Sequence, residues 1–278
     1  MSNIEWTEAT WNPIVGCTIT SPGCTNCYAM KMAGRIERMG TARHYDGTTL
    51  TSKAGSVWTG KLALAPEHVL LAPLRRRKPT TWFVNSMSDL FHEDALDAWI
   101  DRVFAVMALA PQHTFQILTK RAARMRAFLS RHRWHHWARI GRAIDSHRWE
   151  NLPAIMGGDC APLPNVWLGV SAEDQRRWDE RTADLQATPA AIRFVSAEPL
   201  LGPIVGDFSD LDWIIVGGES GPGARHMEDA WAESIVQQCA AAGTAAFVKQ
   251  MGGPVKARMR PIPAHLMVRQ FPEVRSHG

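Results

Sequence analysis

Short runs of β-branched and aromatic residues alternate with amphipathic, helix-like stretches along most of this chain. Strands that are separated by helices pair in parallel, with right-handed crossovers. Seven such strands therefore predict an α/β fold, a barrel or partial barrel with parallel strands. The predicted strands are Thr10–Val15, Thr81–Asn85, Thr114–Leu118, Val166–Val170, Ile192–Val195, Trp213–Val216 and Ala245–Val248. The predicted helices are Tyr28–Met39, Asp94–Leu109, Ala122–Arg131, Gln175–Gln186 and Asp229–Ala242.

The composition is that of an ordinary globular protein. Of the 278 residues, 45% are hydrophobic and 21% are charged, which excludes disorder, collagen and coiled coil as the main structure. No stretch approaches the roughly 20 apolar residues that cross a bilayer, so we expect no membrane association. Met1–Trp6 has neither the basic nor the apolar region of a secretory signal, and we expect a cytoplasmic protein.

Two longer connections interrupt the alternation of strands and helices. One covers residues 40–79, and the other covers residues 132–164. A chain of this length forms one large domain or two small ones. We interpret both connections as insertions in a single domain that covers residues 1–278.

A polar or charged cluster follows each predicted strand. In parallel α/β folds the carboxyl ends of the strands face one mouth, where ligands bind. The alternative explanation is that loops are polar in any protein. It accounts for the polarity, but less well for the repeated position of Ser, Glu, Asp and Lys directly at the strand ends. We therefore expect one shared site. Its members are Cys17, Ser86, Ser88, Asp89, Lys120, Arg121, Ser171, Glu173, Glu198, Glu219 and Lys249.

Three cysteines carry the strongest chemical signal. Cys17, Cys24 and Cys27 have the spacing C-x6-C-x2-C, and Pro22-Gly23 between the first two favours a tight turn. Clustered cysteines in a reducing compartment more often bind metal than form disulfides. Three thiolates can hold an iron–sulfur cluster or three of the four positions around zinc. The alternatives left open are zinc completed by His44 or His92, and reduced cysteines without metal.

Residues 120–149 are strongly basic. They contain nine Lys or Arg and a single acid, Asp145, with Trp134, Trp137 and Trp149 interleaved. Arginine contacts phosphates, and tryptophan offers a stacking face to a base. The segment is therefore either a nucleic-acid contact or an amphipathic helix whose charged face is solvated. A second basic run, Arg75–Lys78, precedes a strand and is expected on the opposite face from the site.

The chain resembles the radical S-adenosylmethionine (SAM) superfamily, and more closely the phage-associated, radical-SAM-like family known for its three-Cys motif. The resemblance covers nearly the whole chain except residues 132–164. The matching segments are residues 10–13 through 29, Phe83–His92, Leu118–Arg121, Asn165–Ser171, Ser196–Leu200, Gly217–Gly221 and Val248–Gly252.

This resemblance implies a partial (β/α) TIM-like barrel of the radical SAM type. It implies that Cys17, Cys24 and Cys27 hold a [4Fe-4S] cluster whose fourth iron binds SAM, and that reductive cleavage of SAM releases a 5′-deoxyadenosyl radical. The sequence departs from the usual C-x3-C-x2-C spacing. The usual Gly-Gly-Glu motif follows the second strand, a place that Ser86–Asp89 takes here, while Gly217–Glu219 follows the sixth strand.

The other site residues receive roles from the same resemblance and from their chemistry. Carboxylate and hydroxyl groups accept hydrogen bonds from an ammonium or from ribose, and cations attract an anionic substrate. The assignments are Ser86, Ser88 and Asp89 for the SAM amine, Ser171 and Glu173 for the ribose, Glu198 and Glu219 for SAM or substrate, and Lys120, Arg121, Arg225 and Lys249 for the substrate. For each residue the alternative is a structural salt bridge.

Two further cysteines stand alone. Cys160 lies in a Gly-Gly-Asp-Cys segment and is a candidate for returning a hydrogen atom to a substrate radical, as a thiol does in spore photoproduct lyase. Cys239 lies within a predicted helix among Gln238 and Ala240, where buried filler is the simpler interpretation.

Three functional hypotheses follow. The favoured one is a radical SAM enzyme that acts on nucleic acid, with repair of a UV-induced DNA photoproduct as its specific case. The second is a radical SAM enzyme on a nucleotide or peptide. The third is a zinc-stabilised nucleic-acid-binding module without catalysis. The expected partners of the first are DNA, a reductant such as flavodoxin or ferredoxin, and a protein encoded beside members of the family.

Overall fold

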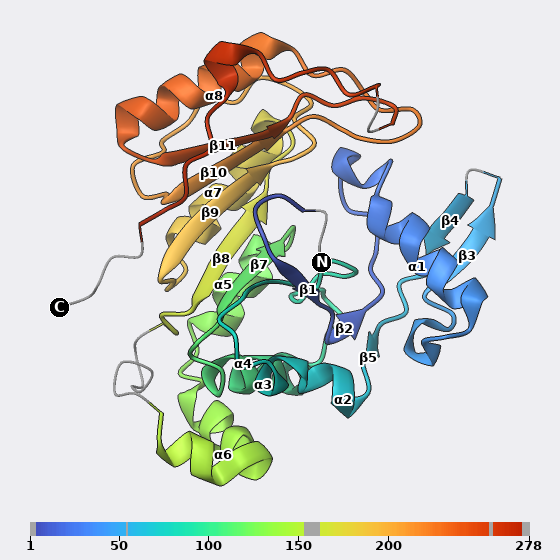
Figure 1. The fold of residues 1–278 in the computed structure, drawn as a ribbon, viewed down its shortest axis with the longest axis vertical. Coiled ribbons are helices and arrows are strands. Elements are labelled where there is room, and N and C mark those ends of the chain that lie inside the picture. Colours follow the sequence, from blue (N-terminus) through green and yellow to red (C-terminus); the bar gives the residue numbers. More distant parts are fainter. Residues whose placement is uncertain (1–3, 54, 153–161, 256–257, 274–278) are drawn as a thin grey trace. The chain divides into compact units, whose positions relative to one another are not determined.

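Seven strands form one hydrogen-bonded sheet in the computed structural model (Figure 1), which describes residues 4–53, 55–152, 162–255 and 258–273. The order across the sheet is β1-β6-β7-β8-β9-β10-β11, which is also the order in the chain. Barrels add strands in chain order, whereas doubly wound sheets reverse at a switch point. The strands are β1 (Ala9–Trp11), β6 (Thr81–Val84), β7 (Thr114–Thr119), β8 (Val166–Ser171), β9 (Ile192–Ala197), β10 (Trp213–Gly217) and β11 (Ala245–Gln250).

The pairs β1–β6, β6–β7, β9–β10 and β10–β11 are parallel. The expected α/β class is therefore confirmed, and the sequential strand order is compatible with a partial TIM-like barrel. Strands β8 and β10 are buried along their whole length. Parallel strands that are covered on both faces are expected to be continuously apolar, which explains why they were predictable.

The first predicted strand, Thr10–Val15, is two strands. β1 ends at Trp11, and β2 (Ile14–Val15) pairs antiparallel with β5 (Ala63–Leu64). Pro13 lies between them and has no N–H for a strand ladder. Its carbonyl instead accepts a hydrogen bond from the Ala65 N–H at 2.8 Å.

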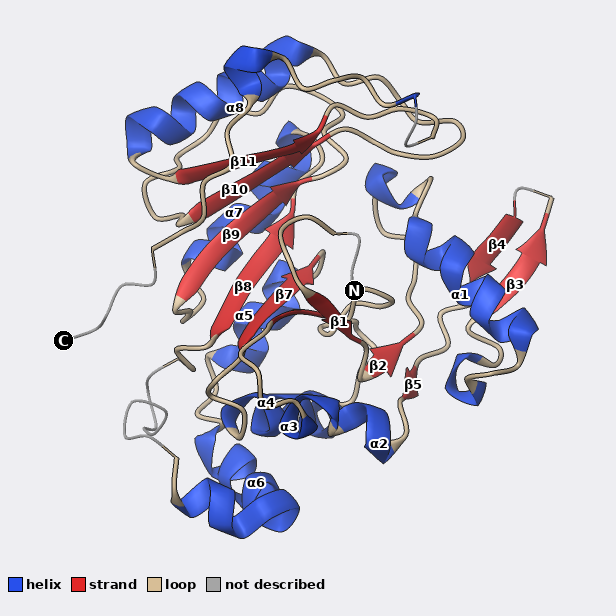
Figure 2. Cartoon of the chain, in the orientation of Figure 1, coloured by secondary structure: helices blue, strands red, loops and turns tan. Residues whose placement is uncertain are grey.

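Three helices have the predicted bounds, and two are shorter (Figure 2). Asp174 caps the start of the helix Gln175–Gln186, because its side chain accepts a hydrogen bond from the Arg177 N–H at 2.9 Å. Gly243 ends the helix Asp229–Ala242 in the left-handed conformation, with φ 71°. The helices are α1 (Tyr28–Met39), α4 (Asp97–Ala108), α5 (Ala122–Leu129), α7 (Gln175–Gln186) and α8 (Asp229–Ala242).

The two long connections contain secondary structure that the sequence patterns did not predict. Residues 40–79 include a hairpin, two one-turn α-helices and a 3-10 turn, and residues 132–164 begin with a 17-residue helix. These elements are η2 (Arg43–Tyr45), β3 (Thr49–Ser52), β4 (Gly55–Trp58), α2 (Glu67–Leu70), α3 (Ala72–Arg75) and α6 (Trp134–Glu150).

The chain divides into two compact units. The first comprises Met1–Ile19, Tyr28–Trp167 and Thr188–Ala191, and the second comprises Thr20–Cys27, Leu168–Ala187 and Ile192–Gly278. The single domain expected over residues 1–278 stays a prediction. Among the helices described, none has the length and apolarity that crossing a membrane requires.

In the first unit, α6 packs on the buried helix α4 through a charged and aromatic contact. Asp101 of α4 is only 3% exposed, and it accepts hydrogen bonds from Arg133 and from Trp137 Nε1. The Trp137 ring stacks on Phe104 with centroids 4.8 Å apart. Trp149 is also buried and lies against Trp134.

These contacts change the interpretation of the basic segment. Two of its three tryptophans, expected to stack on bases, are buried in the first unit. Six of its nine cations form ion pairs within the unit: Arg121, Arg124, Arg131, Arg133, Arg142 and Arg148. The sequence of residues 120–149 conceals this pairing, because most of the partner acids lie in residues 89–101.

In the second unit, a C-terminal segment covers the edge of β11. The Val248 N–H donates to the Val268 carbonyl at 2.9 Å, and the Gln270 N–H donates to the Ala246 carbonyl at 2.9 Å. The Arg269 guanidinium lies 4.8 Å from the centroid of the Phe247 ring. The backbone of β11 on this side is thus paired rather than bare.

We predict that Asp101→Ala lowers the free energy of unfolding by about 3 kcal/mol or more, because it leaves Arg133 and the Trp137 indole without their buried acceptor. Urea unfolding followed by circular dichroism measures this loss. Glu150→Ala is the matched control, since it removes an exposed pair with Arg142 and costs under about 1 kcal/mol. Equal losses in the two variants would contradict the assignment.

Candidate functional site

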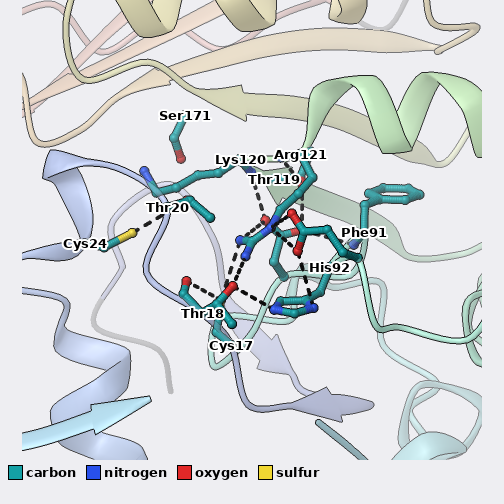
Figure 3. A network of polar contacts seen from close by, with 12 residues as sticks. Cys17, Thr18, Thr20, Cys24, Phe91, His92, Thr119, Lys120, Arg121 and Ser171 are labelled. Atoms are coloured by element: carbon teal, nitrogen blue, oxygen red, sulfur yellow. Dashed lines mark hydrogen bonds and ion pairs between the residues drawn. The ribbon is translucent and has the colours of Figure 1, made fainter. Parts of the chain in front are cut away.

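A buried carboxylate joins the strand ends of the first unit. Asp89 follows β6 and is only 4% exposed. Its partners Phe91, Thr119, Lys120 and Arg121 are labelled in Figure 3. Its Oδ1 accepts from the Phe91 N–H at 3.0 Å and from Thr119 Oγ1 at 2.6 Å. Its Oδ2 accepts from the Lys120 N–H at 2.8 Å and from Arg121 Nη1 at 3.1 Å. Both oxygens are therefore satisfied by donors from its own loop and from the end of β7.

Arg121 extends this network to the first cysteine. Its Nη1 lies 3.6 Å from Cys17 Sγ, and its Nη2 donates to Thr18 Oγ1 at 2.6 Å. Its Nε donates to both oxygens of Glu93, at 3.2 and 3.3 Å. The side chain is 5% exposed, so the cation is available to its buried partners and hardly to solvent.

Cys17 is held as a neutral thiol in this environment. Burial and the nearby charge of Asp89 raise the pKa of Cys17 from 9.0 to about 12, while Arg121 acts in the opposite direction. The thiol donates to the Thr18 carbonyl at 3.5 Å. A metal that bound Cys17 would have to displace this proton.

His92 completes the first-unit network. Its Nδ1 accepts from the Asp94 N–H at 3.1 Å, so Nε2 carries the proton and donates to Thr18 Oγ1 at 2.9 Å. Burial, reinforced by Arg121, lowers the pKa of His92 below its ordinary value of 6.5. Both ring nitrogens are engaged within the protein, and zinc completed by His92 stays an untested alternative.

The two serines predicted beside Asp89 bond to neighbouring chain segments. Ser86 Oγ donates to Asn12 Oδ1 at 3.1 Å, and the Ser86 carbonyl accepts from the Tyr28 hydroxyl at 3.0 Å. Ser88 Oγ donates to the Ile14 carbonyl at 2.9 Å. The structure thus gives Ser86, Ser88 and Asp89 roles in bracing the strand ends, and their role toward the SAM amine stays a prediction.

The loop that carries Cys24 and Cys27 belongs to the second unit. The predicted Pro22-Gly23 turn is present as the 3-10 helix η1 (Pro22–Cys24). The Gly23 N–H donates to Glu173 Oε1 at 3.3 Å. Glu173 is fully buried, and Arg181 Nη1 of α7 neutralises it at 3.0 Å.

A second carboxylate holds the other side of the same loop. Glu219 Oε2 accepts from Asn26 Nδ2 at 2.9 Å and from Arg225 Nε at 2.9 Å, and Arg225 Nη2 donates to the Pro22 carbonyl at 2.9 Å. Burial alone would raise the pKa of Glu219, but hydrogen bonds from Arg225 and Asn26 outweigh it and hold the pKa below 4.5. Glu219 therefore remains a carboxylate that grips the loop.

The glycines before Glu219 are required by close packing. A Cβ on Gly217 would lie 2.5 Å from Glu198 Oε1, and a Cβ on Gly218 would lie 2.4 Å from the Met251 carbonyl oxygen. Glu198 accepts from Lys249 Nζ at 2.8 Å and from Ser196 Oγ at 3.1 Å. Close packing within the second unit therefore explains the two glycines of the Gly217-Gly218-Glu219 segment.

The structure assembles the predicted residues into two networks, each within one unit. Cys17, Asp89 and Arg121 lie in the first network, with the Lys120 backbone, while Cys24, Cys27, Glu173 and Glu219 lie in or around the loop of the second unit. Ser171 is buried at the end of β8, where its carbonyl accepts from Arg181 at 2.7 Å. Cys160 lies outside the described residues.

The described cysteines Cys17, Cys24, Cys27 and Cys239 are thiols. Cys239 is buried in α8, as expected for filler. Within residues 4–53, 55–152, 162–255 and 258–273, no group of three or more Cys, His, Asp or Glu is arranged to hold a metal ion.

Sequence reasoning missed the partners rather than the central residues. Thr18, Asn26, Glu93, Thr119 and Arg181 were not singled out, although each bonds to a predicted site residue or to its partner. For Arg181 the sequence holds one signal: this cation lies eight residues after Glu173, on the helix that follows it. In the structure Arg181 is buried and pairs with Glu173.

We predict that Cys17 in the metal-free protein reacts with iodoacetamide roughly a thousandfold more slowly at about pH 8 than a thiol of ordinary pKa, because so little thiolate is present. Asp89→Asn removes a charge that raises this pKa, so it increases the rate. Peptide mass spectrometry separates Cys17 from Cys239, whose reactivity is the control. An unchanged rate at Cys17 in Asp89→Asn would refute the electrostatic coupling.

We predict that Glu219→Gln accelerates amide hydrogen exchange in residues 20–27 by about tenfold, since a neutral acceptor binds Arg225 less strongly. Because the folded pKa of Glu219 lies below 4.5, its stabilisation is complete above that pH and is lost as pH falls through the folded value. Glu233→Gln on α8 is the control and leaves exchange in this loop unchanged. The assignment fails if both variants exchange alike.

Comparison with known proteins identifies a family. A family model described as a protein of unknown function, DUF5131, matches residues 1–274. No curated protein and no solved structure matches the chain significantly. The match extends over both compact units and includes all the cysteines. The chain therefore belongs to the DUF5131 family.

Proposed function

We propose that this protein is a radical SAM enzyme in which Cys17, Cys24 and Cys27 hold a [4Fe-4S] cluster. The observation that carries the proposal is the C-x6-C-x2-C motif, which follows the first strand of a parallel sheet whose strand order is the chain order. Three clustered cysteines after the first strand of such a sheet are typical of the superfamily that the sequence resembles, although the usual spacing there is C-x3-C-x2-C. The SAM type of partial barrel is part of this proposal.

The chemistry of the donor set supports an iron–sulfur cluster. Thiolates are soft ligands that suit iron–sulfur clusters and zinc, whereas carboxylate and carbonyl oxygens suit magnesium or calcium. The acids beside the motif, Asp89, Glu173 and Glu219, are occupied by protein donors. Three sulfur ligands leave one iron of a four-iron cluster for a small ligand.

The cluster and SAM would supply one-electron chemistry when bound, and the residues of this chain would position and insulate them. Arg121 donates toward Cys17 Sγ, and an N–H donor of this kind stabilises a metal-bound thiolate. Glu173 and Glu219 fix the backbone and side chains around Cys24 and Cys27. The Arg121 side chain beside Cys17 is shielded from water, since it is 5% exposed, while Cys17 itself is half-buried.

We propose nucleic acid as the substrate, with repair of a UV-induced photoproduct as the specific reaction. The support is the basic character of the chain, whose net charge is +4. The paired arginines of α5 and α6 contribute less to that support than their number implies. Nucleotide or peptide substrates are the alternative outcome of the activity assay below.

We predict that protein purified anaerobically and reconstituted contains about four irons and four sulfides per chain and absorbs broadly near about 400 nm. Metal and sulfide analysis with a visible spectrum measures this. The triple variant C17A/C24A/C27A loses the absorbance, while the control variant C239A keeps it. Cleavage of SAM by the reduced protein, with and without UV-irradiated DNA, then tests the reaction and its substrate.

One zinc per chain and no sulfide after reconstitution would sink the radical mechanism. The zinc-stabilised binding module would then be the better assignment. A cluster that forms equally well in the triple cysteine variant would instead show that other residues hold it.

A further inference from the structure

The exposed basic face of α1 differs from the basic face of α5 and α6. The arginines of α5 and α6 mostly pair with carboxylates, as described above. In contrast, Lys31, Arg35 and Arg38 are exposed on α1, and among the described residues no carboxylate lies within ion-pair distance of them. A cluster of exposed cations without a carboxylate partner therefore lies on a different helix from the one that the sequence indicated, and Arg75–Lys78 form a second exposed basic cluster in the same unit.

The arrangement of α1 places these cations in one stripe. They occupy positions i, i+4 and i+7, which lie on one face of a helix. The opposite face, which includes Ala29 and Ala33, is buried, and so is Gly34 at the border of the stripe. A Cβ on Gly34 would lie 1.9 Å from Ser56 Oγ, so the helix packs closely on the hairpin of β3 and β4 (Figure 1).

The one acid of α1 does not neutralise the stripe. Glu37 accepts from the Gly47 N–H at 2.6 Å and from Thr49 Oγ1 at 2.6 Å, and these contacts lower its pKa although burial acts against them. Residues 28–61 contain six Lys or Arg and two Asp or Glu, a formal charge of +4. Like charges at i, i+4 destabilise a helix, so this face carries a cost that a polyanion would relieve.

Aromatic and apolar groups lie on the same face as the cations. Tyr28 is 54% exposed at the start of α1, directly after Cys27 in the chain, and Met32 is 43% exposed. A single strand of nucleic acid is recognised by cations that track its phosphates and by aromatic rings that stack on its bases. On α1 the exposed cations match the phosphates of such a strand, and the exposed Tyr28 ring matches its bases.

We propose that the face of α1 formed by Tyr28, Lys31, Met32, Arg35 and Arg38 binds single-stranded nucleic acid. This inference deepens the proposed function and rests on it for the nature of the substrate. It moves the expected contact from residues 120–149 to the helix that follows the cysteine motif. An acidic protein is the competing occupant, and the polyglutamate competition below distinguishes it from nucleic acid.

The test is fluorescence anisotropy of a labelled single-stranded oligodeoxynucleotide with the full-length, cluster-free protein, at salt from about 50 to about 200 mM. The variant is K31Q/R35Q/R38Q, and the matched control K78Q/R139Q/R176Q removes one lysine and two arginines from exposed positions elsewhere. Three lost phosphate contacts reduce the slope of log K against log salt by about 2 and weaken binding roughly tenfold or more. Circular dichroism verifies that both variants fold.

The proposal is overturned if the wild type does not bind, or if the variant and the control lose affinity equally. It is also overturned if polyglutamate competes as well as unlabelled oligonucleotide does. Because the assay needs no cluster, its failure leaves the radical SAM proposal standing. If the reconstituted protein holds no iron–sulfur cluster but still binds the oligonucleotide through α1, the radical mechanism alone is removed.

Discussion

The buried carboxylate of Asp89 is the interaction on which the strand ends of the first unit depend. Burying a charge costs several kcal/mol, and this cost is offset only where good partners surround the ion. Asp89 has two backbone N–H donors, a hydroxyl and a guanidinium around it. Arg121 then reaches Thr18 and Cys17, so one negative charge after β6 sets the surroundings of a cysteine that follows β2.

The second unit applies the same physical solution to the rest of the cysteine motif. Glu173 and Glu219 stand after β8 and β10, and each carries a salt bridge to an arginine. Glu173 also accepts a hydrogen bond from the Gly23 N–H, and Glu219 accepts one from the Asn26 side-chain amide. Carboxylates at strand ends thus act mainly on the protein itself, because backbone donors of a short loop have no ladder of their own to join.

The sequence predicted the sheet well because buried parallel strands leave an unambiguous apolar pattern. β8 and β10 are continuous apolar runs, and α1, α7 and α8 have the predicted bounds. The break at Pro13 and the helix α6 were missed. α6 depends on Asp101, an acid more than thirty residues before it in the chain, and local patterns hold no record of such a partner.

The site shows the same division between what is local and what is not. Residue types at strand ends were predictable from the strand pattern, and so were the three cysteines. Their contacts were not, because an arginine in a basic run looks the same whether it is solvated or pairs with a buried acid. Arg121 and Arg35 illustrate this: one is enclosed by Asp89 and Glu93, and the other is exposed on α1.

The segment that covers β11 has a consequence for how the protein behaves in concentrated solution. An uncovered edge strand presents a row of donors and acceptors to which a second chain can add, and such addition leads to aggregation. Val268 and Gln270 occupy backbone groups of this edge, and Arg269 places a charge over it. Residues 268–270 therefore close this edge to a second chain, and truncating them would expose it to edge-to-edge association between copies.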